Sequence, residues 1–140
     1  MRKIPRLIAP PLLALLGITA ASAAEPSMVG IWFSAFQPDE PNVMALIEFK
    51  ADGTFEEEFR KCENGEVVGA YFESGKWSLM DGIERIVVET INGERSHNED
   101  NYKIETLTDS ERRVRLEGHD FVFASRRVNN FEFPKCATGT

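Results

Sequence analysis

Apolar and polar residues alternate with a period of two through most of the chain after residue 28, and short polar stretches interrupt the alternation. A period of two is typical of β-strands, because successive side chains point to opposite faces of a sheet. The alternation predicts eight strands, at residues 29–36, 43–50, 54–61, 66–79, 83–91, 101–107, 112–118 and 120–128. The pattern predicts no helix.

The connections between these strands are short and rich in turn-forming residues. They read "PDEPN", "ADG", "ENG", "MDG", "NGERSHNED", "TDSE" and "GHD". Eight strands joined in this way form an antiparallel meander, and closure into a barrel removes its unpaired edges. We therefore predict an all-β fold, a single antiparallel eight-stranded up-and-down barrel. A two-sheet sandwich is the alternative, although its crossings usually need longer connections.

The alternation also assigns side chains to the inside or the outside of the barrel. In residues 43–49 the odd positions are apolar, so odd residues face inward. After the "ADG" turn the same parity places Phe55 and Phe59 inside, with Glu57 between them. An inward carboxylate must hold a proton, meet a cation or bind something. Three interpretations stay open: an internal arginine or tyrosine partner, a bulge that turns Glu57 outward, or contact with a ligand.

Glu73 is a second candidate for an inward carboxylate, because it shares strand parity with Tyr71 and Trp77. The segment "FESG" around it is equally typical of a bulge near a bend. Nothing in the sequence fixes the separation of Glu57 from Glu73, so an acid and base pair does not follow from the pattern.

The first 24 residues have the features of a secretory signal peptide. They begin with three basic residues, continue with an apolar stretch over residues 7–20, and end in small residues. The apolar stretch is short for a bilayer span, and Pro10 and Pro11 interrupt it. We predict a signal peptide at residues 1–24 and one domain at residues 25–140. The mature protein is then exported, periplasmic or secreted, with no membrane span.

Charge excludes some partners. Loss of the leader removes three of the 16 basic residues and none of the 23 acidic ones, which leaves a net charge of −10. Such an acidic domain is a poor ligand for nucleic acid or for anionic lipid.

Two cysteines, Cys62 and Cys136, remain after the leader. Export would place them where disulfides persist, so we predict one structural bridge, with free thiols or an intermolecular link as alternatives. The bridge would hold the C-terminal segment "NNFEFPKC" against the domain.

Several short motifs resemble those of lipocalins and of small bacterial lipocalin-like domains. They are the Gly-x-Trp of Gly30 and Trp32 on the first strand, a second Gly-x-Trp at residues 75–77, "FKADGTF" and "YKIETLT". The resemblance implies that Trp32 plugs the closed end of the barrel. It also implies that Arg126 or Arg127, at the end of the last strand, packs across the indole ring.

No catalytic or metal-binding constellation is evident. The chain lacks a Gly-rich phosphate loop, a Gly-x-Ser-x-Gly elbow, and haem or zinc cysteine motifs. His97 and His119 fall in predicted loops, and the strand pleat separates Glu56, Glu57 and Glu58. We predict no enzyme activity, no catalytic residue, no metal site and no cofactor.

The prediction for function is a protein that binds a small apolar or amphipathic molecule inside the barrel. The candidate ligand-binding residues are Phe49, Phe55, Glu57, Phe59, Tyr71 and Tyr102. The alternative is an envelope interaction or inhibitor module, in which loops contact a protein partner and ten phenylalanines help to fill the interior.

Overall fold

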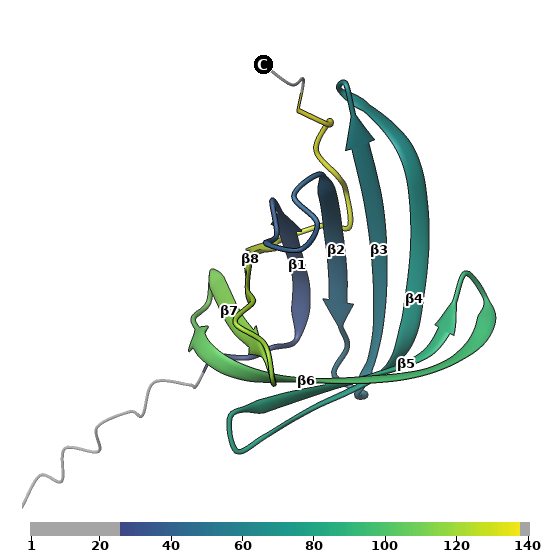
Figure 1. Cartoon of the computed structure of the whole chain (residues 1–140). Coiled ribbons are helices and arrows are strands. Elements are labelled where there is room, and N and C mark those ends of the chain that lie inside the picture. Colours follow the sequence, from purple (N-terminus) through teal and green to yellow (C-terminus); the bar gives the residue numbers. More distant parts are fainter. Residues whose placement is uncertain (1–25, 138–140) are drawn as a thin grey trace, which may run out of the picture.

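The chain folds into a closed barrel of eight antiparallel strands (Figure 1). A computed structural model describes residues 26–137. The strands are β1 (Gly30–Ala35), β2 (Val43–Phe49), β3 (Thr54–Glu63), β4 (Glu66–Met80), β5 (Ile83–Ile91), β6 (Glu94–Leu107), β7 (Glu111–Leu116) and β8 (Val122–Val128). The predicted signal peptide at residues 1–24 lies outside the described residues.

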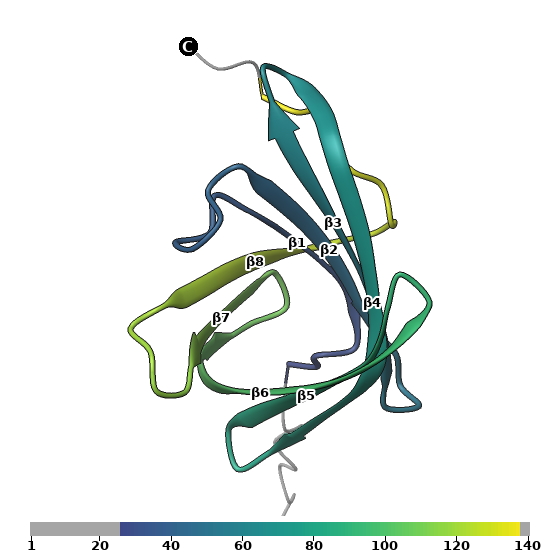
Figure 2. The same cartoon turned by 45° about the vertical axis from the view of Figure 1, so that its right-hand side comes forward.

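Each strand pairs with the next strand in sequence, and β8 returns to pair with β1 (Figure 2). In this last pairing Trp32 lies opposite Arg127, and Phe33 lies opposite Arg126. The all-β, up-and-down barrel that the alternation predicts is therefore confirmed, and the sandwich is wrong. Figure 1 also shows that the β3–β4 hairpin rises beyond β2.

Three hairpins have the tight turns that their sequences require. Both residues of Asn64–Gly65, Asp81–Gly82 and Asn92–Gly93 have positive φ. This geometry is that of a type I′ turn, whose twist matches the twist of the flanking strands and which favours Asn-Gly and Asp-Gly.

The third of these turns corrects one strand boundary. The polar run "NGERSHNED" is not a long loop, because only Asn92 and Gly93 separate β5 from β6. β6 therefore begins at Glu94 rather than at residue 101, and exposed His97 lies on a strand. Pairing with β5, which places Arg95 opposite Thr90, makes this polar segment a strand despite its composition.

One end of the barrel is closed by a packed cluster of apolar side chains. Trp32 and Phe49 are fully buried, Phe55 is nearly so, and Met28 covers them. Trp77 packs edge-on against Phe49, with ring centroids 5.3 Å apart. These aromatic rings contribute a large share of the buried apolar area, which is the main favourable contribution to folding.

Trp32 is held in place by a hydrogen bond from its ring nitrogen and by an arginine over its ring. Its Nε1 donates a hydrogen bond to the Met28 carbonyl at 2.8 Å, and the Arg127 guanidinium carbon lies 4.3 Å from the ring centroid. Arg127 also donates to the backbone carbonyls of Val29 and Ser27. Gly30 has a φ of 136°, and a Cβ at that position would collide with Arg127. Arg126 lies instead over the ring of Phe33, at 4.8 Å.

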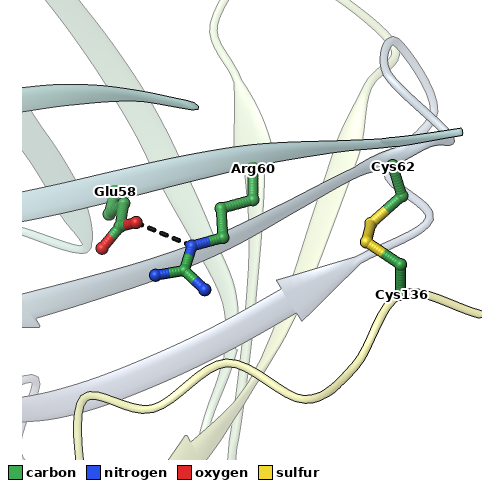
Figure 3. Close-up of a disulfide and its surroundings, with 4 residues drawn as sticks. All are labelled: Glu58, Arg60, Cys62 and Cys136. Carbon is green, nitrogen blue, oxygen red and sulfur yellow. Dashed lines mark hydrogen bonds and ion pairs between the residues drawn. A yellow bond between two sulfur atoms is a disulfide. The ribbon is translucent and has the colours of Figure 1, made fainter. Parts of the chain in front are cut away.

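The C-terminal segment packs on the outer face of the barrel (Figure 3). A disulfide joins Cys62 to Cys136, with Cα atoms 5.7 Å apart, and this confirms the predicted bridge. The Arg60 guanidinium carbon lies 4.2 Å from the centroid of the Phe133 ring, and Arg60 also pairs with Glu58 at 2.7 Å. Phe133 of the C-terminal segment therefore covers Arg60 on the outer face of β3.

Replacement of Trp32 tests the closed end. We expect Trp32→Ala to lower the free energy of unfolding by about 3–5 kcal/mol, because the side chain is fully buried and its removal leaves a cavity. The exposed Phe72 provides a matched control, and Phe72→Ala should change stability by less than about 0.5 kcal/mol. Urea denaturation followed by circular dichroism measures both values. Equal stabilities of the two variants would contradict the assignment of Trp32 to the barrel floor.

Removal of the disulfide tests the attachment of the tail. The bridge spans 74 residues of sequence. The double variant Cys62→Ser/Cys136→Ser should lose about 2–4 kcal/mol, because the unfolded chain regains the freedom of that loop. Urea denaturation of the oxidised protein and the variant measures the loss. A variant as stable as the oxidised protein would show that the bridge does not constrain the fold.

Candidate functional site

A cavity of about 310 Å³ lies inside the barrel. Its apolar wall includes Val43, Ala45 and Ile47 of β2, Ile86 and Val88 of β5, and Val114 of β7. The odd residues of β2 thus face inward, as the alternation indicates. The floor beneath the cavity is the closed-end cluster that contains Trp32.

Aromatic side chains line two sides of the cavity. Phe59 and Tyr71 are cross-strand partners on β3 and β4, and their rings stack 4.4 Å apart at an interplanar angle of 11°. Tyr102 of β6 meets Phe123 of β8 edge-on, with centroids 5.9 Å apart. Burial is the main cause that raises the pKa of Tyr71 and of Tyr102, so both phenols are neutral and can donate hydrogen bonds.

A buried ion pair crosses the interior between β5 and β7. Arg112 Nε donates to Glu84 Oε2 at 3.0 Å, and Arg112 Nη2 donates to Glu84 Oε1. Arg112 Nη1 also donates to Ser125 Oγ at 3.3 Å, and the guanidinium lies 5.3 Å from the centroid of the Phe49 ring. Glu84 is fully buried and Arg112 is 8 % exposed. The bidentate geometry offsets the desolvation of both charges.

Two further carboxylates face the cavity from neighbouring strands. Glu57 of β3 lies directly opposite Glu73 of β4, and both line the cavity. Burial first, and then the charge of Glu73, raises the pKa of Glu57 from 4.5 to about 8, while Arg112 opposes the shift. Burial also raises the pKa of Glu73, with smaller contributions from Asp100 and Glu40. The cavity therefore holds a carboxyl group that retains its proton at neutral pH.

The predicted ligand-binding residues divide between the cavity and the floor. Glu57, Phe59, Tyr71 and Tyr102 line the cavity. Phe49 and Phe55 face inward but lie lower, in the closed-end cluster. Parity along a strand assigns a face but not a height in the barrel, so it does not separate floor from cavity wall.

The sequence reasoning missed Glu84 and Arg112 as interior residues. In β5 both faces carry apolar and polar residues, so the alternation does not place Glu84. In β7 the signal is the spacing of Arg112 and Val114, two residues apart, which puts them on one face. Of the three interpretations of Glu57, an internal arginine partner is not what the structure shows, because Arg112 pairs with Glu84. No register shift turns Glu57 outward; the nearby bulge lies between Ser74 and Gly75, against β5.

Fold and site together define a class: an up-and-down β-barrel with a closed floor and an internal cavity of mixed polarity. The chain belongs to the family of proteins with a lipocalin-like domain, whose family model matches residues 28–111. No curated protein matches the sequence. Within residues 26–137 we find no helix of the length and hydrophobicity that a membrane span requires.

The buried ion pair generates the first prediction for the site. Arg112→Met should destabilise the protein by about 3–5 kcal/mol, because the charge of Glu84 stays buried without its partner. The double variant Arg112→Met/Glu84→Leu should recover most of this loss, since it removes both charges. The control Arg115→Met breaks the partly exposed pair with Glu105 and should cost less than about 1 kcal/mol. Urea denaturation measures the stability of these three variants, and a double variant no more stable than Arg112→Met would refute the pairing.

The raised pKa of Glu57 predicts a pH dependence of stability. The folded protein holds the proton of Glu57 up to a pKa of about 8, whereas the unfolded chain releases it near 4.5. The contribution of this group is therefore fully present below the unfolded pKa, and stability falls as pH rises toward the folded pKa. Glu57→Gln should flatten this fall.

The matched control is Glu56→Gln on the outward face, where Glu56 pairs with Lys50 at 3.0 Å. The measurement is the free energy of unfolding in urea at several pH values across this window. If Glu57→Gln keeps the slope of the natural protein, the carboxyl group does not titrate as an interior acid.

Proposed function

We propose that this is an exported binding protein that holds a small apolar or amphipathic molecule inside its barrel. The observation that carries the proposal is the cavity of about 310 Å³ with aromatic, aliphatic and carboxyl groups in its wall. Ligand sites in proteins are mostly apolar clefts or cavities of about this size with a few fixed polar groups. Membership of the lipocalin-like family supports binding rather than catalysis.

The side chains of the cavity wall could contact both the apolar and the polar part of such a ligand. Phe59, Tyr71 and Tyr102 offer aromatic surface, and Glu57 offers a polar contact in the same cavity. Phe49 and Phe55 form part of the floor beneath the cavity. The alternative function is an envelope interaction or inhibitor module, which assumes that side chains fill the barrel interior. The cavity of about 310 Å³ argues against a filled interior.

Export is part of the proposal. A disulfide between Cys62 and Cys136 is stable in oxidising compartments and rare in the reducing cytosol. It agrees with a leader sequence at residues 1–24 that has the features of a signal peptide. These two features together support a periplasmic or secreted location.

The neutral fluorescent probe N-phenyl-1-naphthylamine tests the cavity. Its emission should rise when it binds the natural protein, and Ala45→Phe should weaken binding by at least about tenfold, because the added ring occupies the cavity. Ala70→Phe is the matched control, since Ala70 is exposed and its neighbour Tyr71 faces inward. Unchanged affinity in Ala45→Phe would place the probe outside the barrel.

Native mass spectrometry of protein purified from its own cells complements the probe. A discrete added mass that is lost on denaturation would establish a bound molecule and give its class.

A further inference from the structure

Two pairs of residues lie next to each other on the inward face of β3 and β4. In one pair Phe59 stacks on Tyr71, and in the neighbouring pair Glu57 lies directly opposite Glu73. Like charges directly opposite each other across a strand pair destabilise a sheet. Side chains in this arrangement lower the stability of the free protein unless a proton or a cation lies between them.

Within residues 26–137, neither Glu57 nor Glu73 has a cationic side chain in ion-pair contact. Eight ion pairs occur among residues 26–137, and none includes Glu57 or Glu73. Arg112, the basic residue in the described wall of the cavity, is already engaged by Glu84 and Ser125. Outward carboxylates such as Glu99 and Glu105, in contrast, have arginine partners at 2.6 Å. Among the described residues, Glu57 and Glu73 inside the cavity thus lack the arginine partners that these outward carboxylates have.

The cavity as a whole attracts positive charge. Its acidic residues are Asp39, Glu40, Glu57, Glu73, Glu84 and Asp100, against the one arginine. Asp39, Glu40 and Asp100 are exposed at its rim, where they can draw a cation toward the interior. An anionic amphiphile would be repelled by these rim carboxylates before it entered the cavity.

We propose that the ligand is an amphipathic organic cation, with an ammonium group held between Glu57 and Glu73 and its apolar body against Phe59 and Tyr71. This inference rests on the proposed function, because it names the ligand class of the same cavity. An ammonium has three donors for the two carboxylates, and it gains a cation–π interaction beside an aromatic ring. The aliphatic wall formed by Ile86 and Val88 lies in the same cavity and suits an alkyl or aryl body.

An organic cation fits better than a metal ion. No group of three or more His, Cys, Asp or Glu side chains among residues 26–137 is arranged to hold a metal. Hard metal ions need six or more oxygen ligands at short distance, whereas an ammonium is satisfied by two or three acceptors. The stacked aromatic pair beside the carboxylates also offers a surface for an apolar ligand body.

Binding should be accompanied by loss of a proton. Glu57 faces Glu73, Glu84 and Arg112 inside the barrel, with the neutral phenols of Tyr71 and Tyr102 in the same wall and Asp39, Glu40 and Asp100 at the rim. Its pKa of about 8 means that the free protein is mostly protonated there at neutral pH. An ammonium between the two carboxylates favours their charged forms, so the proton leaves to solvent while the ligand stays charged.

Isothermal titration calorimetry with three ligands of equal chain length tests the proposal: n-octylammonium, 1-octanol and octanoate. We expect octylammonium to bind about tenfold or more tightly than 1-octanol, since charge-assisted hydrogen bonds exceed neutral ones, and octanoate to bind weakest. Glu57→Gln and Glu73→Gln should each reduce this preference, the ratio of octylammonium affinity to 1-octanol affinity, to within about threefold. Glu56→Gln is the outward control and should keep the full preference.

Circular dichroism shows whether each variant retains the barrel fold. In two buffers of different ionisation enthalpy, octylammonium binding should release up to about one proton per site near pH 7, and 1-octanol binding should release none. Absence of proton release would overturn the role of Glu57.

The outcomes separate the two proposals. Equal affinity for octylammonium and 1-octanol, or tighter binding of octanoate, would overturn the cation inference and leave the binding function standing. Displacement of octylammonium by an equal concentration of calcium chloride would overturn the preference for an organic cation. If neither N-phenyl-1-naphthylamine nor any octyl ligand binds, both proposals fail.

Discussion

The return of β8 to β1 is the constraint on which the rest of the structure depends. Without it the sheet would have two unpaired edges and no enclosed interior. Arg127 reinforces this closure, because it lies across Trp32 and donates hydrogen bonds to the carbonyls of Val29 and Ser27. A single side chain thus joins the last strand, the first strand and the floor. The enclosed space above that floor exists because the floor is packed and the barrel is closed.

The acidic residues of the chain differ in their partners according to whether they face outward or into the barrel. Outward glutamates such as Glu99 and Glu105 have arginine partners, which is an ordinary arrangement on the exposed face of a sheet. Inside, Glu84 has Arg112, but Glu57 and Glu73 face each other. Net charge alone indicates only which partners to exclude. The charge of the cavity depends on which carboxylates lie inside the closed barrel.

The sequence was sufficient for the barrel and for part of the candidate site. Period-two alternation and Asn-Gly or Asp-Gly turns are local signals, so strand number, order and the inward faces of β2 and β3 follow from them. The start of β6 does not, because a polar segment becomes a strand only when β5 pairs with it. The Arg112 and Glu84 pair joins residues 28 apart in sequence, and no local pattern connects them. Height in the barrel, which separates Phe55 from Phe59, depends on the tilt and stagger of the strands.

An interior that could have been filled by apolar side chains instead contains charge and space. Ten phenylalanines are available, yet Phe36 and Phe72 are exposed and Phe131 lies outside on the tail. An apolar residue in place of Glu57 would remove the cost of burying a carboxyl group. Stability alone therefore does not account for the carboxyl pair. Functional sites commonly keep side chains that cost stability, and the carboxyl pair agrees in this respect with the proposed binding site.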